Sequence, residues 1–379
     1  MPNDVQQNAT QSTVLRTGLT IGAIYSALAI RDTAGMKPES TAMAAIKGDA
    51  PSLTVDAVAH AVQTAFGLRG DYSPLVSERD QNFMLRSANG SCFVVKVTSR
   101  FEKSVATDFQ IDALQHLERA RDVVVPQVFR TLSGESSCRI ADEHGAYRLR
   151  VVTWVDGVPL ESQPLEQDAA RELGTALARL DRAFGGFSHP GERPELLWDL
   201  QRATELRGLL PCIDDVDIKA SVARVVDDFE REVLPEMPRL RSQVIHGDPN
   251  PGNVLMTDPG MGFIDFGDIV KAPLVFDVAI AASYLRVFES SPLQFIVPFV
   301  AAYHVVMPLE PKEADLLFDL VRARLATTIS LLYWRLAARG QDDPYRQKAL
   351  EGESGAAGFL GLLDALGRDG FRQEISFIK

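Results

Sequence analysis

Residues 244–268 hold the side chains with the clearest capacity for chemistry. Asp248 and Asn253 stand in a His-Gly-Asp-x-x-x-x-Asn sequence, and Asp265 opens an Asp-Phe-Gly sequence. Carboxylate and amide oxygens are the ligands that a hard cation such as Mg²⁺ prefers. These residue types in this order therefore predict a magnesium site built from Asn253 and Asp265, with the carboxylate of Asp248 beside it.

The chain between the two expected ligands is predicted to form a β-hairpin. Two short apolar runs flank the turn sequence Asp-Pro-Gly, the usual pattern of two strands joined by a tight turn. With Pro259 at the midpoint, Val254 would face Ile264, and Asn253 would face Asp265. Directly opposed residues in such a ladder have Cβ atoms roughly 5 Å apart, so both side chains would reach one cation.

The spacing Asp-x-x-x-x-Asn, a hairpin and then Asp-Phe-Gly is the arrangement of phosphoryl-transfer enzymes of the protein-kinase type. In that arrangement Asp248 orients the acceptor hydroxyl and takes its proton, while Asn253 and Asp265 hold the ions that bridge the nucleotide phosphates. Either tripeptide by itself is compatible with an ordinary turn. Their order and spacing together favour the kinase interpretation, since a motif gains weight from its structural context.

Three polar residues flank the expected catalytic groups. His246 follows an apolar Val-Ile pair and is expected to brace the loop by hydrogen bonds rather than to do chemistry. Asp268 either lies at the entrance of the substrate site or caps a turn. Asp277 opens an apolar stretch and is expected to be a helix N-cap or a brace for the catalytic loop.

A lysine in an apolar strand indicates where the nucleotide binds. Residues 54–66 have helical apolar spacing, and an Asn-Gly turn then predicts a hairpin whose second strand is residues 91–97. Apolar residues at alternate positions of that strand face one way, and Lys96 faces the other. Since lysine is rarely buried unless paired, we expect Lys96 to contact nucleotide phosphates; the alternative is an edge lysine that blocks aggregation.

Two features depart from the usual kinase pattern. The helix expected from about residue 104 carries Gln110 where a kinase has a glutamate that pairs with the strand lysine, and an amide cannot neutralise an ammonium group. The sequence contains no G-x-G-x-x-G. The loop from Ser77 to Asn82 is therefore expected to cover the phosphates with backbone amides and side chains. Arg79 in this loop either faces a phosphate or, as we expect, pairs with an adjacent acid, Glu78 or Asp80.

The strand over residues 147–155 ends at an Asp-Gly-Val-Pro sequence. In a two-lobed kinase the hinge between the lobes falls here, so backbone groups of Thr153, Trp154 and Val155 are expected to bind the nucleotide base. Backbone recognition leaves little trace in a sequence. ATP and GTP are therefore equally compatible as the phosphate donor.

Beyond the expected hinge the chain is mostly helical. Apolar residues recur at helical spacing over residues 168–184, 217–233, 273–285, 293–306 and 312–338. Strands in the first half and helices in the second predict an α+β, two-lobed protein-kinase-like fold, with a small β-sheet N-lobe and a larger, mainly helical C-lobe. We place the N-lobe at 51–156 and the C-lobe at 157–379, after a poorly ordered extension over 1–50.

Composition limits the possible partners. A net charge of −12 over 379 residues argues against nucleic acid or an anionic membrane as a main partner. Three scattered cysteines indicate free thiols in a reducing compartment, and no apolar run is long enough to span a bilayer. We therefore expect a cytoplasmic enzyme whose partner is a small molecule; its oligomeric state is left open.

Taken together, these motifs resemble the aminoglycoside phosphotransferase superfamily, and within it the hydroxylysine kinase group. The resemblance covers roughly residues 55–340. It rests on Ser-Glu-Arg-Asp-Gln-Asn-Phe from residue 77, Lys96, Gln110, Trp-Asp-Leu from residue 198, His-Gly-Asp and Ile-Asp-Phe-Gly-Asp. It implies Mg²⁺-dependent transfer of the γ-phosphate of ATP or GTP to the hydroxyl of a small amine or amino acid.

Acceptor recognition is expected in the helical half. An amino acid needs a carboxylate for its ammonium group and a cation for its carboxylate. By position relative to the resemblance, the candidates are Asp268, Trp198, Asp199, Arg202, Arg322 and Arg335, each with an ordinary core or surface role as its alternative. Two other functions stay open: a kinase of another small alcohol, such as choline, homoserine or an aminoglycoside, and a nucleotide-binding pseudokinase with a regulatory role.

Overall fold

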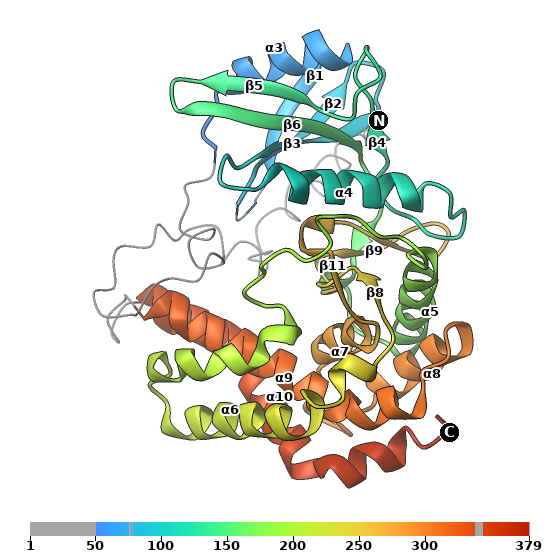
Figure 1. The fold of residues 1–379 in the computed structure, drawn as a ribbon, viewed down its shortest axis with the longest axis vertical. Helices are drawn as coiled ribbons and strands as arrows, with labels where there is room; N and C mark the ends of the chain where they lie inside the picture. Colours follow the sequence, from blue (N-terminus) through green and yellow to red (C-terminus); the bar gives the residue numbers. More distant parts are fainter. Residues whose placement is uncertain (1–50, 76, 78, 338–343, 379) are drawn as a thin grey trace, which may run out of the picture.

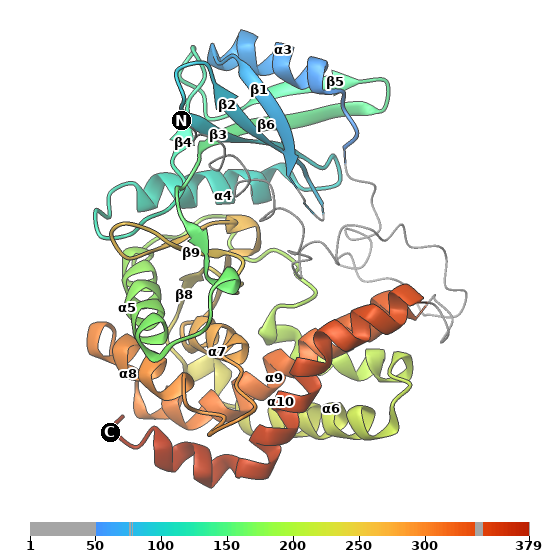
Figure 2. The same cartoon turned by 180° about the vertical axis from the view of Figure 1, so that it is seen from behind.

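The computed structural model describes residues 51–379 except 76, 78, 338–343 and 379. The prediction for residues 1–50 falls outside the described residues. A small sheet with two helices is followed by a larger helical part (Figures 1 and 2), so the predicted two-lobed α+β fold is confirmed. None of the described helices combines the length and apolarity needed to cross a membrane.

The first lobe is built around one antiparallel sheet. Its elements are α3 (Val55–Phe66), β1 (Gly70–Leu75), β2 (Gln81–Ser87), β3 (Cys92–Thr98), α4 (Ser104–Leu117), β4 (Val128–Phe129), β5 (Cys138–Asp142) and β6 (Gly145–Thr153). The strand order is β1-β2-β3-β6-β4, with β5 also paired to β6. The side chain of Thr54 accepts a hydrogen bond from Ala57 N (3.3 Å) at the start of α3, and Gly67 ends this helix in the left-handed region with φ +71°.

The two faces of the sheet have different roles. Phe93, Val95 and Val97 of β3 are buried with the apolar side chains of α3, β2 and β6. Since side chains alternate along a strand, Lys96 faces away from this core, and it lines a cavity together with Gln110 of α4 and Asp265 of the second lobe. Helix α4 lies between the sheet and the second lobe (Figures 1 and 2). The predicted orientation of the strand is confirmed.

The second lobe contains the catalytic segment and a set of helices. Its elements are β7 (Val158–Pro159), η1 (Leu160–Ser162), α5 (Gln167–Ala183), η2 (Leu200–Cys212), α6 (Val216–Asp228), η3 (Phe229–Val233), η4 (Met237–Arg239), β8 (Ser242–Ile245), β9 (Val254–Met256), β10 (Met261–Phe263), η5 (Phe266–Asp268), β11 (Val270–Pro273), α7 (Val275–Tyr284), α8 (Ile296–Val306), α9 (Pro311–Leu336) and α10 (Pro344–Glu374). The five predicted helices are confirmed, except that the segment 217–233 divides into α6 and the π-helical turn η3.

Helix α9 is the centre of the second lobe. It packs against α7, α10 and η2, and it is buried on nearly all sides. A helix buried all round is normally apolar all round, so the arginines Arg322 and Arg324 within it need charged partners. Arg322 pairs with Asp228 and Asp364 inside the helical lobe. The partner of Arg324 lies in the catalytic loop.

Candidate active site

The predicted hairpin is formed by β9 and β10, but the predicted register is wrong by one residue. Phe263, not Ile264, lies opposite Val254. Ile264 in turn pairs with Asn253, whose carbonyl oxygen accepts a hydrogen bond from Ile264 N at 2.9 Å.

The turn explains this shift. Thr257 N donates to Gly260 O at 2.8 Å, which leaves a loop of two residues whose midpoint falls between Asp258 and Pro259. Asp265 therefore lies one residue beyond the position opposite Asn253. Its φ of +58°, in the left-handed region that residues other than glycine rarely adopt, turns the chain into η5 at this point.

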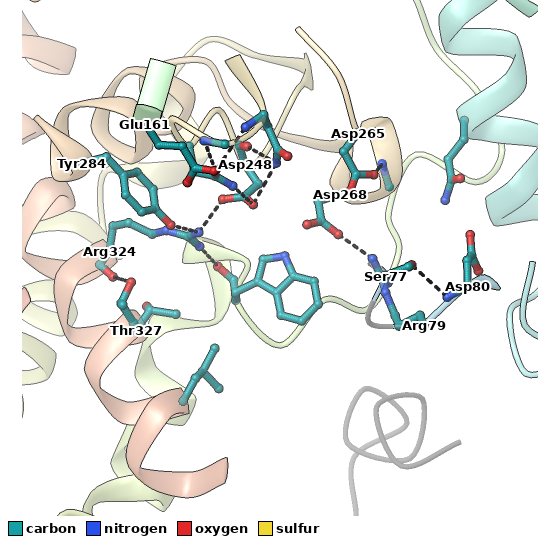
Figure 3. Close-up of a pocket in the computed structure, with 18 of the residues that line it drawn as sticks. Ser77, Arg79, Asp80, Glu161, Asp248, Asp265, Asp268, Tyr284, Arg324 and Thr327 are labelled. Carbon is teal, nitrogen blue, oxygen red and sulfur yellow. Dashed lines mark hydrogen bonds and ion pairs between the residues drawn. The ribbon is translucent and has the colours of Figure 1, made fainter. Parts of the chain in front are cut away.

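Asp248, Asn253 and Asp265 nevertheless come together on one cavity. The cavity has a volume of about 280 Å³ and lies between the two lobes. Figure 3 shows Glu161, Tyr284, Arg324 and Thr327 on one side of Asp248, and Asp265, Asp268, Ser77 and Arg79 on the other. We call it the polar cavity.

The carboxylate of Asp248 accepts from three side-chain donors, of which Asn253 Nδ2 is the most distant, 3.4 Å from Oδ2. Asn250 Nδ2 donates to Oδ2 at 2.7 Å, and Arg324 Nη2 donates to Oδ1 at 2.7 Å. The same guanidinium donates to the hydroxyl oxygen of Tyr284 at 3.0 Å. Burial raises the pKa of the Asp248 carboxyl, and the positive charge of Arg324 opposes this rise.

The loop that carries Asp248 is braced from below. His246 N and Gly247 N each donate to a carboxylate oxygen of Asp277 at 2.8 Å. The ring Nε2 of His246 lies 3.0 Å from Ile264 O. Asp277 is therefore a brace for the loop rather than the N-cap of α7, and His246 has the bracing contacts that were expected.

Gly247 explains why this loop has His-Gly-Asp. Its φ is +80°, and a Cβ at this position would lie 2.3 Å from the carbonyl oxygen of Asp268. Only glycine allows both the left-handed backbone and this close approach. The contact joins the loop of Asp248 to the segment that follows Asp265.

Lys96 pairs with a carboxylate of the second lobe instead of with the helix position that Gln110 occupies. Its Nζ lies 3.4 Å from Asp265 Oδ1, and its ammonium charge lowers the pKa of Asp265 to about 2. Gln110 instead accepts a hydrogen bond from Arg150 Nη2 at 2.5 Å and donates to Glu102 at 3.4 Å. Lys96 thus has a charged partner even though Gln110 stands where a kinase has a glutamate.

Arg79 crosses from the first lobe to the second. Its guanidinium lies 2.7 Å from Asp268 Oδ1 and over the ring of Trp198, 5.3 Å from the centroid. The ion pair expected with an adjacent acid is not formed with Asp80, and Glu78 falls outside the described residues. Burial raises the pKa of Asp268 to about 6, against the opposing effect of Arg79.

A second, more apolar cavity of about 370 Å³ lies beside the predicted hinge. Thr153, Trp154 and Val155 line it. The N–H groups of Thr153 and Trp154 donate to Gln127 O (2.9 Å) and Cys92 O (3.1 Å). Of the three, only the N–H of Val155 has no hydrogen-bond partner among the described residues. We call this space the hinge cavity.

The two cavities meet at the centre of the cleft. The residues that line both are Lys96, Gln110, Asn253 and Asp265. Of the loop residues predicted to cover the phosphates, Ser77 lines the polar cavity and Asn82 lines the hinge cavity. A molecule that occupies both cavities must therefore pass the expected phosphate and metal ligands.

Three of the acceptor candidates lie elsewhere. Asp199 caps η2 by accepting a hydrogen bond from Gln201 N at 3.0 Å, Arg202 pairs with Glu205, and Arg322 is held in the helical core. A sequence cannot distinguish such capping and pairing residues from ligands. The other three candidates, Trp198, Asp268 and Arg335, line the polar cavity.

Several residues of the polar cavity were not predicted. Glu161 follows the hinge, and Asn250 lies within the catalytic loop itself. Tyr284 and Arg324 come from α7 and α9, far along the chain. The only sequence signal for Arg324 is an arginine inside an apolar helical pattern, which indicates a buried charge without naming its partner.

Comparison with known proteins places this site in a family. Residues 71–317 match the profile of the phosphotransferase enzyme family, APH. The chain belongs to this family. Hydroxylysine kinase of Danio rerio is 25% identical over 318 residues, which cover 79% of this chain and 89% of that protein. Hydroxylysine kinase of Mus musculus is 27% identical over 297 residues, which cover 71% and 78%.

Solved structures of this phosphotransferase type share the fold. An amicoumacin kinase superposes with a TM-score of 0.65 at 15% identity, covering 83% of this chain and 95% of its own. A microcompartment-associated aminopropanol kinase gives 0.63 at 18% identity, covering 83% and 98%. The predicted family and activity class are confirmed: the chain is a small-molecule phosphotransferase with an alcohol group as acceptor.

Proposed function

We propose that this phosphotransferase transfers the γ-phosphate of ATP or GTP to the hydroxyl of a small amine or amino acid. Its relatives are named hydroxylysine kinase, and hydroxylysine is such an acceptor. The observation that carries this proposal is the junction of the two cavities at Lys96, Asn253 and Asp265. A nucleotide whose base fills the hinge cavity directs its phosphates to this junction. An acceptor in the polar cavity then faces the last phosphate from the side of Asp248.

The hinge cavity suits a nucleotide base. Its lining includes the apolar side chains of Val94, Val152, Leu255 and Phe266. The N–H of Val155 is the donor of the hinge that is available to a base edge. Lys96 supplies a positive charge at the junction, where the phosphates would lie.

Asn253 and Asp265 fit a Mg²⁺ ion as protein ligands. Asp265 is ionised at neutral pH because Lys96 lowers its pKa to about 2. Asn253 Nδ2 donates to Asp248 O at 3.1 Å, which leaves its Oδ1 for a cation. Mg²⁺ usually takes only one or two protein carboxylates, with phosphate oxygens and water as its other ligands. When bound, it neutralises the charge that develops on the transferred phosphate.

Asp248 is assigned as the group that takes the acceptor proton. Asn250 and Arg324 fix the direction of its carboxylate, and its side chain stays 16% exposed toward the cavity in which the acceptor would lie. The acceptor hydroxyl donates its proton to Asp248 as its oxygen attacks the γ-phosphorus, and the nucleoside diphosphate leaves on the opposite side.

The charges of the polar cavity fit an acceptor that carries both an ammonium group and a carboxylate. Glu161 and Asp268 are acids on its walls, and Trp198, with Arg79 over its ring, also lines it. Arg335 lies on α9 eleven positions after Arg324, at the same helix face as Thr328 and Leu331, and offers a cation to a carboxylate.

The test is nucleotide consumption with a panel of hydroxylated amino acids and the matching amino alcohols, with ATP and GTP in parallel. We expect turnover with an amino acid and a higher KM for its amino alcohol. Arg335→Met should raise the KM of the amino acid and leave that of the amino alcohol unchanged. Equal effects on both acceptors would remove Arg335 from carboxylate recognition.

The role of Asp248 is tested by Asp248→Asn, which keeps the shape of the side chain. Loss of a general base lowers kcat by about 10²- to 10⁴-fold, while calorimetry should give an unchanged Kd for the nucleotide. Unchanged turnover in this variant would contradict the assignment.

A further inference from the structure

A second acid lies behind the catalytic loop and has no part in the proposed chemistry. Asp181 stands near the end of α5, and both Asp181 and Asp277 are 0% exposed. Asp277 is the residue whose two oxygens hold the backbone of His246 and Gly247. The two acids are close enough for the negative charge of Asp277 to raise the pKa of Asp181.

Hydrogen bonding around this pair requires an additional proton. Both oxygens of Asp277 already accept backbone N–H groups. Asp181 Oδ2 accepts from the hydroxyl of Tyr303 at 2.6 Å, whereas Oδ1 has no donor among the described residues. Two carboxylates cannot hydrogen-bond to each other, because neither has a hydrogen. A proton on Asp181 satisfies both groups.

We propose that Asp181 is a positioning residue that carries one proton at neutral pH and donates it through Oδ1 to Asp277. Asp277 can then act as a single carboxylate that holds the catalytic loop. This inference deepens the proposed function, since it rests on the assignment of Asp248 to that loop. Its physical basis is that two negative charges side by side in a buried site cannot both persist.

The surroundings of the pair support the neutral form. The titratable groups that face it are Tyr303 from α8 and His246 from the end of β8; Glu313 lies beyond Tyr303 and is neutralised by Arg241. Within the part of the chain that the structure describes, no lysine or arginine is among the groups that act on Asp181. Burial, and then the charge of Asp277, raise the pKa of Asp181.

Close packing of two helices holds the pair in place. A Cβ at Gly174 would lie 2.1 Å from Phe299 O, so glycine permits α5 to lie directly against α8. This approach brings Tyr303 to Asp181. Gln243 fixes the backbone of the same residue, since its side-chain amide donates to Asp181 O at 2.6 Å.

The proton can be counted without measuring turnover. If folded Asp181 keeps a proton that the unfolded chain releases, the free energy of unfolding falls as pH rises from about 5 to 8. The slope of this free energy against pH then corresponds to about one proton released from this site on unfolding. Asp181→Asn removes that proton, so its slope should differ from the wild type by about one proton. The measurement is urea unfolding at several pH values.

Asp168→Asn is the matched control, because Asp168 lies on the same helix with its side chain 94% exposed. It should keep the wild-type slope. Equal slopes for wild type and Asp181→Asn would overturn the proposal, whatever acceptor the enzyme uses. This outcome is distinct from failure of the proposed function, which the acceptor panel tests separately.

Turnover then tests the positioning role. Asp181→Asn retains an N–H donor toward Asp277 and should keep kcat within about threefold, whereas the isosteric Asp181→Leu has no donor and should lower kcat at least about tenfold with an unchanged nucleotide Kd. Equal loss of kcat in both variants would contradict donation to Asp277. If Asp181→Leu does not fold, the proposal is tested by comparing the pH dependence of the unfolding free energy of Asp181→Asn with that of the wild type.

Discussion

Arg324 Nη2 lies 2.7 Å from Asp248 Oδ1, although the two residues are 76 positions apart in the chain. Arg324 belongs to the central helix α9 and is 5% exposed. The pair thus joins the catalytic loop to the core of the helical lobe. It also determines how readily the expected base accepts a proton, because burial raises the pKa of Asp248 and Arg324 opposes that rise.

Arg324→Met should move the acid limb of the kcat–pH profile to higher pH. Without the guanidinium the pKa of Asp248 rises further, so a larger fraction of the base is protonated at any given pH. We expect kcat at pH 7 to fall by roughly tenfold. Arg322→Met is the matched control, since Arg322 lies on the same helix, is also 5% exposed and pairs away from the cleft. It should lower stability and leave the acid limb in place. If the acid limb of the kcat–pH profile of Arg324→Met stayed at its wild-type position, Arg324 would not control the pKa of Asp248.

Asp265→Asn should weaken binding of the Mg–nucleotide. Loss of the ligand carboxylate is expected to raise its Kd by about 10- to 100-fold, measured by calorimetry with Mg²⁺ present. With EDTA in place of Mg²⁺ the variant and the wild type should differ far less. Asp268→Asn, in the same segment, should leave the Mg–nucleotide Kd unchanged. Wild-type affinity in Asp265→Asn would remove this residue from the metal site.

Asp268 should make acceptor binding pH-dependent. Burial raises the pKa of this carboxyl to about 6, so it is charged at pH 7 and largely neutral at pH 5. The KM of a cationic acceptor should therefore rise as pH falls through about 6, and the nucleotide KM should not follow. In Asp268→Asn the acceptor KM should be high and nearly constant over this range. A wild-type acceptor KM that does not change would exclude Asp268 from ammonium recognition.

Gly247→Ala should affect both stability and turnover. The left-handed backbone by itself costs a residue with a side chain about 1–2 kcal/mol. At Gly247 the added Cβ would also lie 2.3 Å from Asp268 O, so the loop of Asp248 must move. Gly90→Ala is the control, because Gly90 has φ +89° and no atom within 4 Å of the added Cβ. Thermal unfolding should show a loss of stability in both variants, larger in Gly247→Ala, and only that variant should lose kcat. Equal kcat in the two variants would contradict the importance of this contact.

Some interactions of the cleft could not be predicted because they connect segments that are distant in sequence. Arg79 was expected to pair locally, yet its partner is Asp268, 189 positions away. Asp199 was a candidate for the acceptor site by its position relative to the family resemblance, together with its neighbour Trp198, yet it caps η2. Adjacent residues commonly point in different directions, so proximity in sequence does not place both on one cavity.

The sequence by itself determined the family, the two-lobed plan and the face of β3 that carries Lys96. These follow from local order: motif spacing in the catalytic segment and the periods of strand and helix, which depend only on neighbouring residues. The tertiary structure decided the hairpin register, the partner of Lys96 and the arginine beside Asp248. A charge in the interior must find its counter-charge wherever packing brings one near, and that packing is known only once the helices are in place.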